Sequence, residues 1–206
     1  MNREDGDRGA VVPATPGRVV DSSNLDLAAA ERATRDLLRA IGADPDAPDL
    51  LETPRRVAAS FAELVTPAEF GATVFPNEGY DELVLVRDIS FQTLCMHHLL
   101  PFHGVAHVAY LPGDSIIGLS KLARVVEYFA RDLQLQERMT VQIADWLEQE
   151  LAPRGVGVVL SAEHMCMTIR GVRKPGARTV TSALRGTLRS DARTRQEFFS
   201  LVDKCG

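Results

Sequence analysis

The stretch that decides the fold is DELVLVRDISFQTLCMHHLLPFHGVAHVAYLP, residues 81–112. Two runs in it, 81–94 and 104–112, are rich in β-branched and aromatic residues and are typical of β-strands. The second run closes on a Pro-Gly-Asp turn. Between the runs lies CMHH, which concentrates a thiol and two imidazoles in four residues. Strands that neighbour each other in sequence favour antiparallel pairing, so the stretch points to the α+β class.

Helices are predicted on both sides of this stretch, because apolar residues there recur at helical spacing. On the N-terminal side, Ser23 or Asn24 is expected to cap a helix that ends at Gly42, and a second helix follows Thr53. On the C-terminal side the pattern predicts helices over 119–133 and from about Thr140, strands over 155–162, 163–171 and 179–188, and a terminal helix over 191–202.

The chain is expected to form one domain over residues 23–206, with N-terminal helices over 23–66 and a catalytic core over 80–203. Residues 1–22 are rich in Gly, Pro and charge without a period, which predicts a disordered tail.

Composition excludes several classes of partner. The net charge of −5 does not favour nucleic acid, and no stretch approaches the ~20 apolar residues of a membrane span. The N-terminus lacks the apolar segment of a secretory signal, so the chain is expected in the cytoplasm. Three cysteines there are not a disulfide framework, and Cys205 is expected to be a free thiol near the chain end.

Two segments predict a metal site. If EHMCMTIRG, 163–171, is a strand, His164, Cys166 and Arg170 share one face of it. Cys95 and His98 have the two-residue spacing that lets both side chains reach one ion, and Cys166 would complete a Cys₂His set. Three protein ligands leave a position for water, which is the catalytic arrangement of zinc. The alternative is that both cysteines are small buried hydrophobic residues.

Proton transfer near such a metal needs histidines that do not bind it. His97 and His164 are the candidates, since each lies beside a proposed ligand in sequence. The alternative is that either histidine only supports the site or the core.

A basic group near the start of the 119–133 helix predicts anion binding. Ser120, Lys121 and Arg124 lie together there, and helix N-termini attract anions. With Arg170, and with Arg173 or Lys174, they could hold several phosphates; a solvated basic face is the alternative. Glu137 could accept from the N1–H and 2-amino groups of guanine, or be an ordinary surface charge. The combination predicts hydrolysis at a carbon of a purine nucleotide.

Four segments closely resemble GTP cyclohydrolase I, and the resemblance runs from about residue 24 to 203: CMHHLLPFHGVAHVAYLP, GLSKLARVVEYFARDLQLQERMTVQIA, AEHMCMTIRGVRKPGARTVTSALRG and TRQEFFSLV. The resemblance implies a tunnelling (T-) fold, in which an antiparallel sheet is backed by helices and carries an N-terminal helical extension. It also implies a toroidal homodecamer with sites at subunit interfaces, and a role in tetrahydrofolate biosynthesis and one-carbon metabolism.

The resemblance implies the reaction as well. GTP is hydrolysed at guanine C8, formate leaves, and the ribose rearranges to give 7,8-dihydroneopterin triphosphate. The implied roles are these: zinc (Zn²⁺) ligands Cys95, His98 and Cys166; catalytic residues His164 for the imidazole ring and His97 with Ser120 for the ribose; guanine contacts Glu137 and Gln136; triphosphate contacts Lys121, Arg124 and Arg170; and Arg55 or Arg56 reaching a neighbouring subunit's phosphates.

One residue departs from the family pattern: Met96 stands where family members usually have Glu. A thioether neither exchanges protons nor accepts a strong hydrogen bond, whereas zinc binding does not depend on this position. One alternative is therefore a paralogue with partial or altered chemistry, which stops at a formamidopyrimidine or takes another nucleotide. A non-catalytic T-fold subunit is a further alternative. The complete ligand set and the presence of both histidines argue against it.

Overall fold

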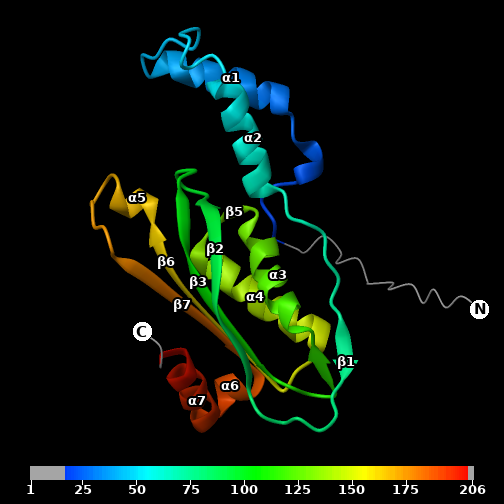
Figure 1. Cartoon of the computed structure of the whole chain (residues 1–206). Helices are drawn as coiled ribbons and strands as arrows, with labels where there is room; N and C mark the ends of the chain where they lie inside the picture. The colour runs from blue at the N-terminus through cyan, green and yellow to red at the C-terminus, as the bar shows by residue number, and fades with distance from the viewer. Residues whose placement is uncertain (1–16, 204–206) are drawn as a thin grey trace, which may run out of the picture.

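The computed structural model describes residues 17–203, so most of the expected tail and Cys205 lie outside the described residues. The elements, in chain order, are η1 (Ser22–Asn24), α1 (Leu27–Ala40), α2 (Thr53–Val65), β1 (Val74–Pro76), β2 (Val84–Cys95), β3 (Pro101–Leu111), β4 (Ser115–Ile117), α3 (Leu119–Ala130), β5 (Leu133–Gln134), α4 (Gln136–Leu151), β6 (Gly155–His164), α5 (Met165–Thr168), β7 (Arg178–Arg185), α6 (Gly186–Ser190) and α7 (Ala192–Asp203) (Figure 1).

The quoted stretch forms the central hairpin of a five-stranded sheet with the order β5-β2-β3-β6-β7. Its strands β2 and β3 pair antiparallel from Val84↔Tyr110 to Leu94↔Pro101, with one irregularity between Val86 and Ile89. β3, β6 and β7 continue the antiparallel pairing, and only the two-residue β5 runs parallel to its neighbour. The predicted α+β class, an antiparallel sheet backed by helices, is confirmed.

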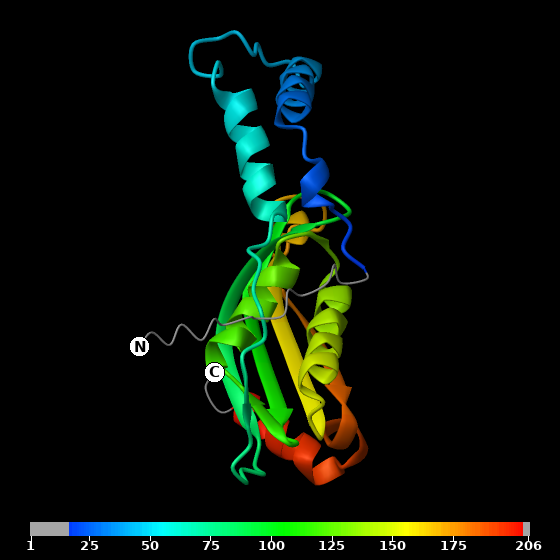
Figure 2. The ribbon, with the colours of Figure 1, turned by 90° about the vertical axis from the view of Figure 1, so that its right-hand side faces the viewer.

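Helices cover the two faces of the sheet unequally (Figures 1 and 2). α3 and α4 lie along one face, where Phe129 and Ile143 are fully buried in the main core. α6 and α7 cover only one end of the other face, through Leu188 and Phe198. Gly157 permits this approach, since a Cβ there would lie 2.7 Å from a Leu188 methyl. The opposite end of the sheet, where the β2–β3 connection lies, is left free for a site.

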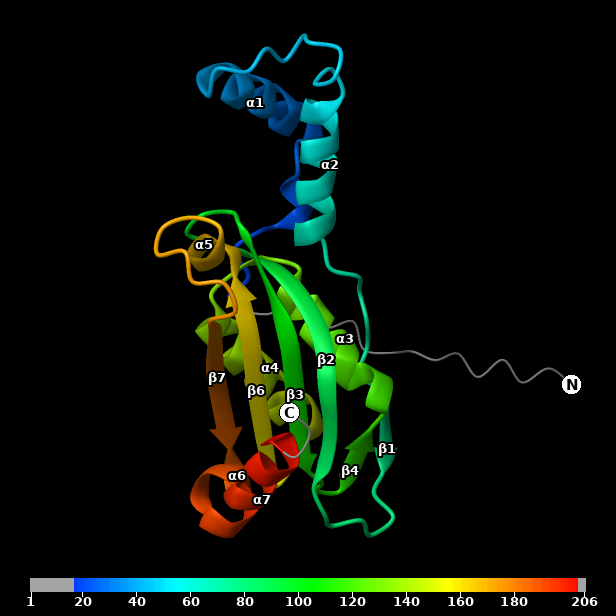
Figure 3. The same ribbon diagram turned by 60° about the vertical axis from the view of Figure 1, so that its left-hand side comes forward.

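The N-terminal helices α1 and α2 pack on each other and extend beyond the end of the sheet (Figures 1 and 3). Asp26 caps α1 by accepting the Ala29 N–H at 2.8 Å, which corrects the expected cap at Ser23 or Asn24. Gly42 follows the helix with a φ of +86°, as predicted for its end. No helix within residues 17–203 has the length and apolar character needed to cross a membrane.

The expected strand over 163–171 is wrong beyond His164. β6 ends there, and Met165 starts the short helix α5. Phe102↔His164 is the last pair of the β3–β6 ladder, and the next residue of β3 is Pro101, which has no N–H to donate. The predicted alternation of side chains past His164 therefore does not occur.

Other boundaries also differ from the sequence prediction. β7 ends at Arg185 rather than continuing to 188, because Gly186 takes a φ of +54° in contact with the Arg154 backbone. α4 begins at Gln136, before the expected start near Thr140. The sequence did not predict β1, β4 and β5, since two or three residues are too short for a pattern. The terminal helix capped by Asp191 is confirmed: that carboxylate accepts the Thr194 N–H at 2.8 Å.

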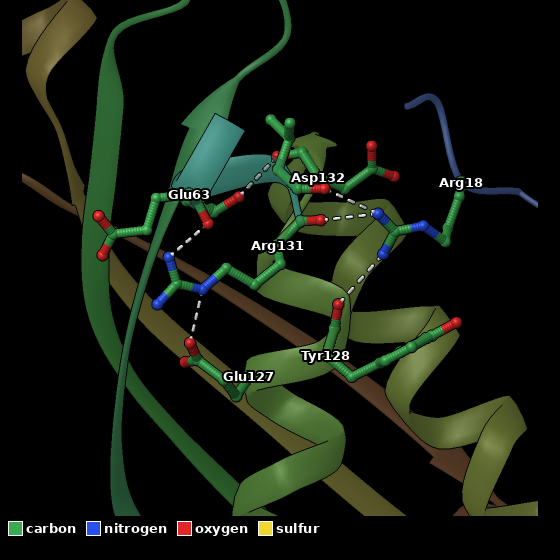
Figure 4. A network of polar contacts seen from close by, with 8 residues as sticks. Arg18, Glu63, Glu127, Tyr128, Arg131 and Asp132 are labelled. Atoms are coloured by element: carbon green, nitrogen blue, oxygen red, sulfur yellow. Dashed lines mark hydrogen bonds and ion pairs between the residues drawn. The ribbon is translucent and has the colours of Figure 1, made fainter. Parts of the chain in front are cut away.

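Arg18 pins the N-terminal segment to the end of α3 (Figure 4). Its guanidinium donates to the carbonyl oxygens of Val65 at 3.1 Å and Arg131 at 2.9 Å. It also lies over the Tyr128 ring, 5.5 Å from the ring centroid. One cation thus joins the N-terminal segment, α2 and α3.

The buried carboxylate of Asp132 also binds the N-terminal segment. It accepts the backbone N–H groups of Val19 and Val20, both at 2.9 Å, and that of Leu133 at 2.8 Å. Residues 17–22 therefore differ from the expected disordered tail. A partner more than 100 positions away orders them, which no local composition reveals.

The Asp132→Ala variant is expected to be markedly less stable. It leaves three backbone N–H groups without their acceptor around a fully buried position, which should lower the free energy of unfolding by about 3 kcal/mol. Urea denaturation at a fixed protein concentration measures the loss. Asp191→Ala, which removes a surface cap, is the matched control at about 1 kcal/mol. Equal losses in the two variants would contradict the role given to Asp132.

Candidate metal centre and nucleotide site

A tight turn at the end of β2 positions Cys95 and His98. The N–H groups of His98 and Leu99 both donate to the Cys95 carbonyl, at 3.2 and 2.8 Å, and Leu99 takes a φ of +55°. The Met96 N–H donates to the Gln134 carbonyl of β5 at 3.1 Å, which fixes the turn to the sheet. Cys95 Sγ and His98 Nδ1 consequently lie 4.0 Å apart.

α5 brings Cys166 to the same place. One ligand atom from each of Cys95, His98 and Cys166 lies within 4.8 Å of the others. Among residues 17–203, these three form the group of His, Cys, Asp or Glu side chains that is close enough to share a metal ion. Cys95 is buried, Cys166 is half-buried and His98 is exposed. The three residues that sequence spacing selected therefore converge, although Cys166 reaches the site from a helix rather than a strand.

The chemistry of these donors fits a soft divalent cation. Burial raises the pKa of the Cys166 thiol, and the neighbouring Cys95 thiol raises it further, against a smaller opposing effect of Arg170. Two adjacent thiols are costly to ionise without a cation, whereas a bound cation deprotonates its thiol ligands. Two thiolates and one imidazole are a ligand set that zinc takes.

His164 is held by Gln136 and Phe102. The Gln136 Nε2 donates to the carbonyl oxygens of Leu160 at 3.2 Å and Thr179 at 2.9 Å, so its Oε1 faces His164 Nε2, 2.8 Å away. These partners assign the proton of the neutral imidazole to Nε2 and leave the lone pair on Nδ1. Phe102 stacks on the ring, with centroids 4.4 Å apart and planes 7° apart.

The environment of His164 also sets its charge. Burial lowers the pKa of His164, and the nearby Glu137 carboxylate opposes that shift. Burial therefore favours the neutral imidazole, whose free Nδ1 is the atom that can take up a proton. Glu137 itself is exposed in the first turn of α4, at the same end of the molecule.

Gln136, the predicted guanine contact, is only 1% exposed, and its side-chain amide is bonded within the chain, where it also contacts His164. Its contact with guanine stays a prediction. The sequence reading missed Phe102. Its cross-strand pairing with His164 was the available signal, and that pairing needs the register of β3 and β6.

The remaining predicted residues fall into two separate places. His97 is exposed beside His98, with ring centroids 6.3 Å apart, and Arg170 is exposed just after α5. Ser120, Lys121 and Arg124 instead lie in the first turns of α3. α3 begins near β1 and β4 and ends near β5, at the end of the sheet where the Cys95 turn lies (Figures 1 and 3). Its twelve residues span about 18 Å. Within residues 17–203, the two groups therefore belong to different parts of the fold.

Comparison with known proteins finds one enzyme family. The family model described as GTP cyclohydrolase I matches residues 30–203. The GTP cyclohydrolase 1 of Bacillus subtilis is 55% identical over 180 residues, which cover 84% of this chain and 94% of that protein. The GTP cyclohydrolase 1 of Bacillus pumilus is 54% identical over 178 residues, with the same two coverages. That of Aquifex aeolicus is 52% identical over 179 residues, covering 86% and 97%.

Proposed function

The chain belongs to the GTP cyclohydrolase I family of enzymes, and on that premise we propose that it converts GTP to 7,8-dihydroneopterin triphosphate and formate with one zinc ion. The observation that carries the proposal is the convergence of Cys95, His98 and Cys166 within 4.8 Å, next to a histidine fixed for proton transfer.

The proposed metal ligands are the side chains of these three residues. Zinc bound there would lower the pKa of a water molecule to about 7 and so supply a nucleophile for guanine C8. The chain's own contribution is to hold the donors in a turn anchored at Met96 N–H and to bury Cys95 against the core.

His164 is the proposed proton carrier for the imidazole ring of guanine. Gln136 fixes its Nε2–H, so Nδ1 is the atom that exchanges the proton, and the stacked Phe102 keeps the ring plane constant. His97 is exposed next to the metal ligands and is proposed to serve the ribose steps together with Ser120. Glu137 is the proposed guanine contact, since it is exposed and close to His164.

A complete site is proposed to need more than one copy of the chain. The metal ligands, both histidines, Glu137 and Arg170 lie at one end of the sheet, whereas Ser120, Lys121 and Arg124 lie at the start of α3. A neighbouring copy could bring its α3 to the Arg170 of this one, so that the triphosphate is held from both chains. A closed ring of copies, for which the resemblance gives a homodecamer, repeats that contact at every site.

Met96 favours a second candidate, a reaction that stops after the first hydrolysis. Its N–H is bonded to Gln134, so the turn is held whatever the side chain, but a thioether beside the metal ligands cannot move a proton. We propose the full reaction, because His164 and His97 both lie near the proposed metal ligands and can transfer protons in place of the missing carboxylate. The intact ligand set counts against a non-catalytic subunit. The folate pathway and the cytoplasmic location remain predictions.

The ratio of the two products separates these candidates. Purified zinc-loaded protein given GTP is expected to release formate and oxidisable, fluorescent pterin in equal amounts. A Met96→Glu variant is expected to keep that ratio and to change the rate by less than about tenfold, since the residue is not a ligand. A product of GTP plus one water, with neither formate nor pterin, from the unmodified protein, together with both products from Met96→Glu, would show that the second candidate is right.

A further inference from the structure

The loop between α5 and β7, residues 169–177, carries three cations, and all are exposed: Arg170, Arg173 and Lys174. It follows α5, the short helix that carries Cys166, and ends where β7 begins. Arg170 is close enough to affect the pKa of Cys166, so this end of the loop adjoins the proposed metal centre. The loop therefore carries positive charge next to the proposed metal centre.

Little within the loop itself fixes its shape. Gly171, Arg173 and Gly176 all have positive φ values, of 64°, 51° and 80°. Its backbone is bonded by Lys174 N–H to the Met167 carbonyl at 3.0 Å, and by two longer turn contacts. A non-glycine residue at positive φ persists only when its surroundings impose it.

One carboxylate joins the two ends of this loop. Glu163 Oε1 accepts the Gly176 N–H at 2.9 Å and the Thr168 hydroxyl at 3.1 Å. Glu163 lies on β6 and belongs to the sheet, opposite His103 on β3 and Arg178 on β7. The Arg178 side chain places a positive charge beside this carboxylate.

We propose that Glu163 is a positioning residue for triphosphate binding, which acts by closing the loop 169–177 so that its cations face the substrate. The inference rests on the proposed function for the identity of the ligand. Glu163 does not touch GTP in this scheme. It ties Gly176 and Thr168 to the rigid sheet, and through them it fixes the position of Arg170 and its neighbours.

The test compares Glu163→Ala with Glu163→Gln, which keeps an oxygen that can accept both hydrogen bonds. Glu163→Ala is expected to raise the KM for GTP about tenfold and to change kcat less than about twofold, because loss of uniform binding raises KM alone. Glu163→Gln is expected to stay within about threefold of the unmodified protein in KM. Glu150→Ala, an exposed carboxylate on α4, is the matched control and should change nothing.

Limited trypsin digestion measures how accessible the loop 169–177 is, and it does not depend on GTP turnover. Cleavage after Arg170 or Arg173 is expected to be about ten times faster in Glu163→Ala than in Glu163→Gln, and inorganic tripolyphosphate is expected to slow it in the unmodified protein. Unchanged cleavage and unchanged KM in Glu163→Ala would overturn the inference. If the unmodified protein binds tripolyphosphate but does not turn over GTP, the proposed function fails, and the cleavage rates still decide the role of Glu163.

Discussion

The Cys166→Ala variant is expected to lose its zinc and almost all of its GTP turnover. Two ligands from the Cys95 turn remain, and two are too few for a stable site where three protein donors converge. Turnover is expected to fall about a thousandfold or more, since the metal contributes several kcal/mol to the stabilisation of the transition state. Elemental analysis of the purified protein measures zinc per chain, and formate release measures turnover.

Cys205→Ala is the matched control for this experiment, because it removes the one cysteine that the proposed site does not use. It is expected to keep one zinc per chain and full turnover. Circular dichroism of Cys166→Ala should match that of the control, since Cys166 is only half-buried on a four-residue helix. Full zinc occupancy in Cys166→Ala would refute the ligand assignment.

Two inactive variants are expected to restore each other when they are assembled together. Cys166→Ala damages the metal group, and Arg124→Glu reverses a charge in the α3 group. If each site takes one group from each of two chains, an equal mixture contains about one quarter of sites with both groups intact. Co-expression with separate tags, followed by purification through both tags, gives the mixed assembly.

The control mixture is Cys166→Ala with His98→Ala, in which both defects fall in the same group of residues. No mixed site is then complete, so turnover is expected to stay below about one hundredth of the unmodified level. Restored turnover in this control, or none in the first mixture, contradicts a site that is shared between copies.

The sequence predicted the parts of the molecule that depend on local pattern. The strands of the central hairpin, the helices behind them and the cap at Asp191 all follow from spacing over a few residues. The convergence of Cys95 and His98 was predicted for the same reason. Cys166 does lie beside these two residues, but the strand argument for its position was wrong, since the ladder ends at His164.

The missed features depend on contacts between distant residues. Asp132 holds a segment more than 100 positions away, and Gln136 reaches Leu160 and Thr179 as well as His164. Each of these polar groups is buried, so its partners are obligatory, yet no pattern along the chain specifies them. The burial of Gln136 illustrates the difficulty, because it depends on how α4 packs against β6 and β7.

The most direct test of the central claim is the mass of the product that the zinc-loaded protein makes from GTP labelled with ¹³C at C8. The complete reaction gives a triphosphate product that has gained one water, lost formic acid and kept no label, with the ¹³C recovered in formate. A product of GTP plus one water that retains the label would contradict the complete reaction, and unchanged GTP would contradict the activity altogether.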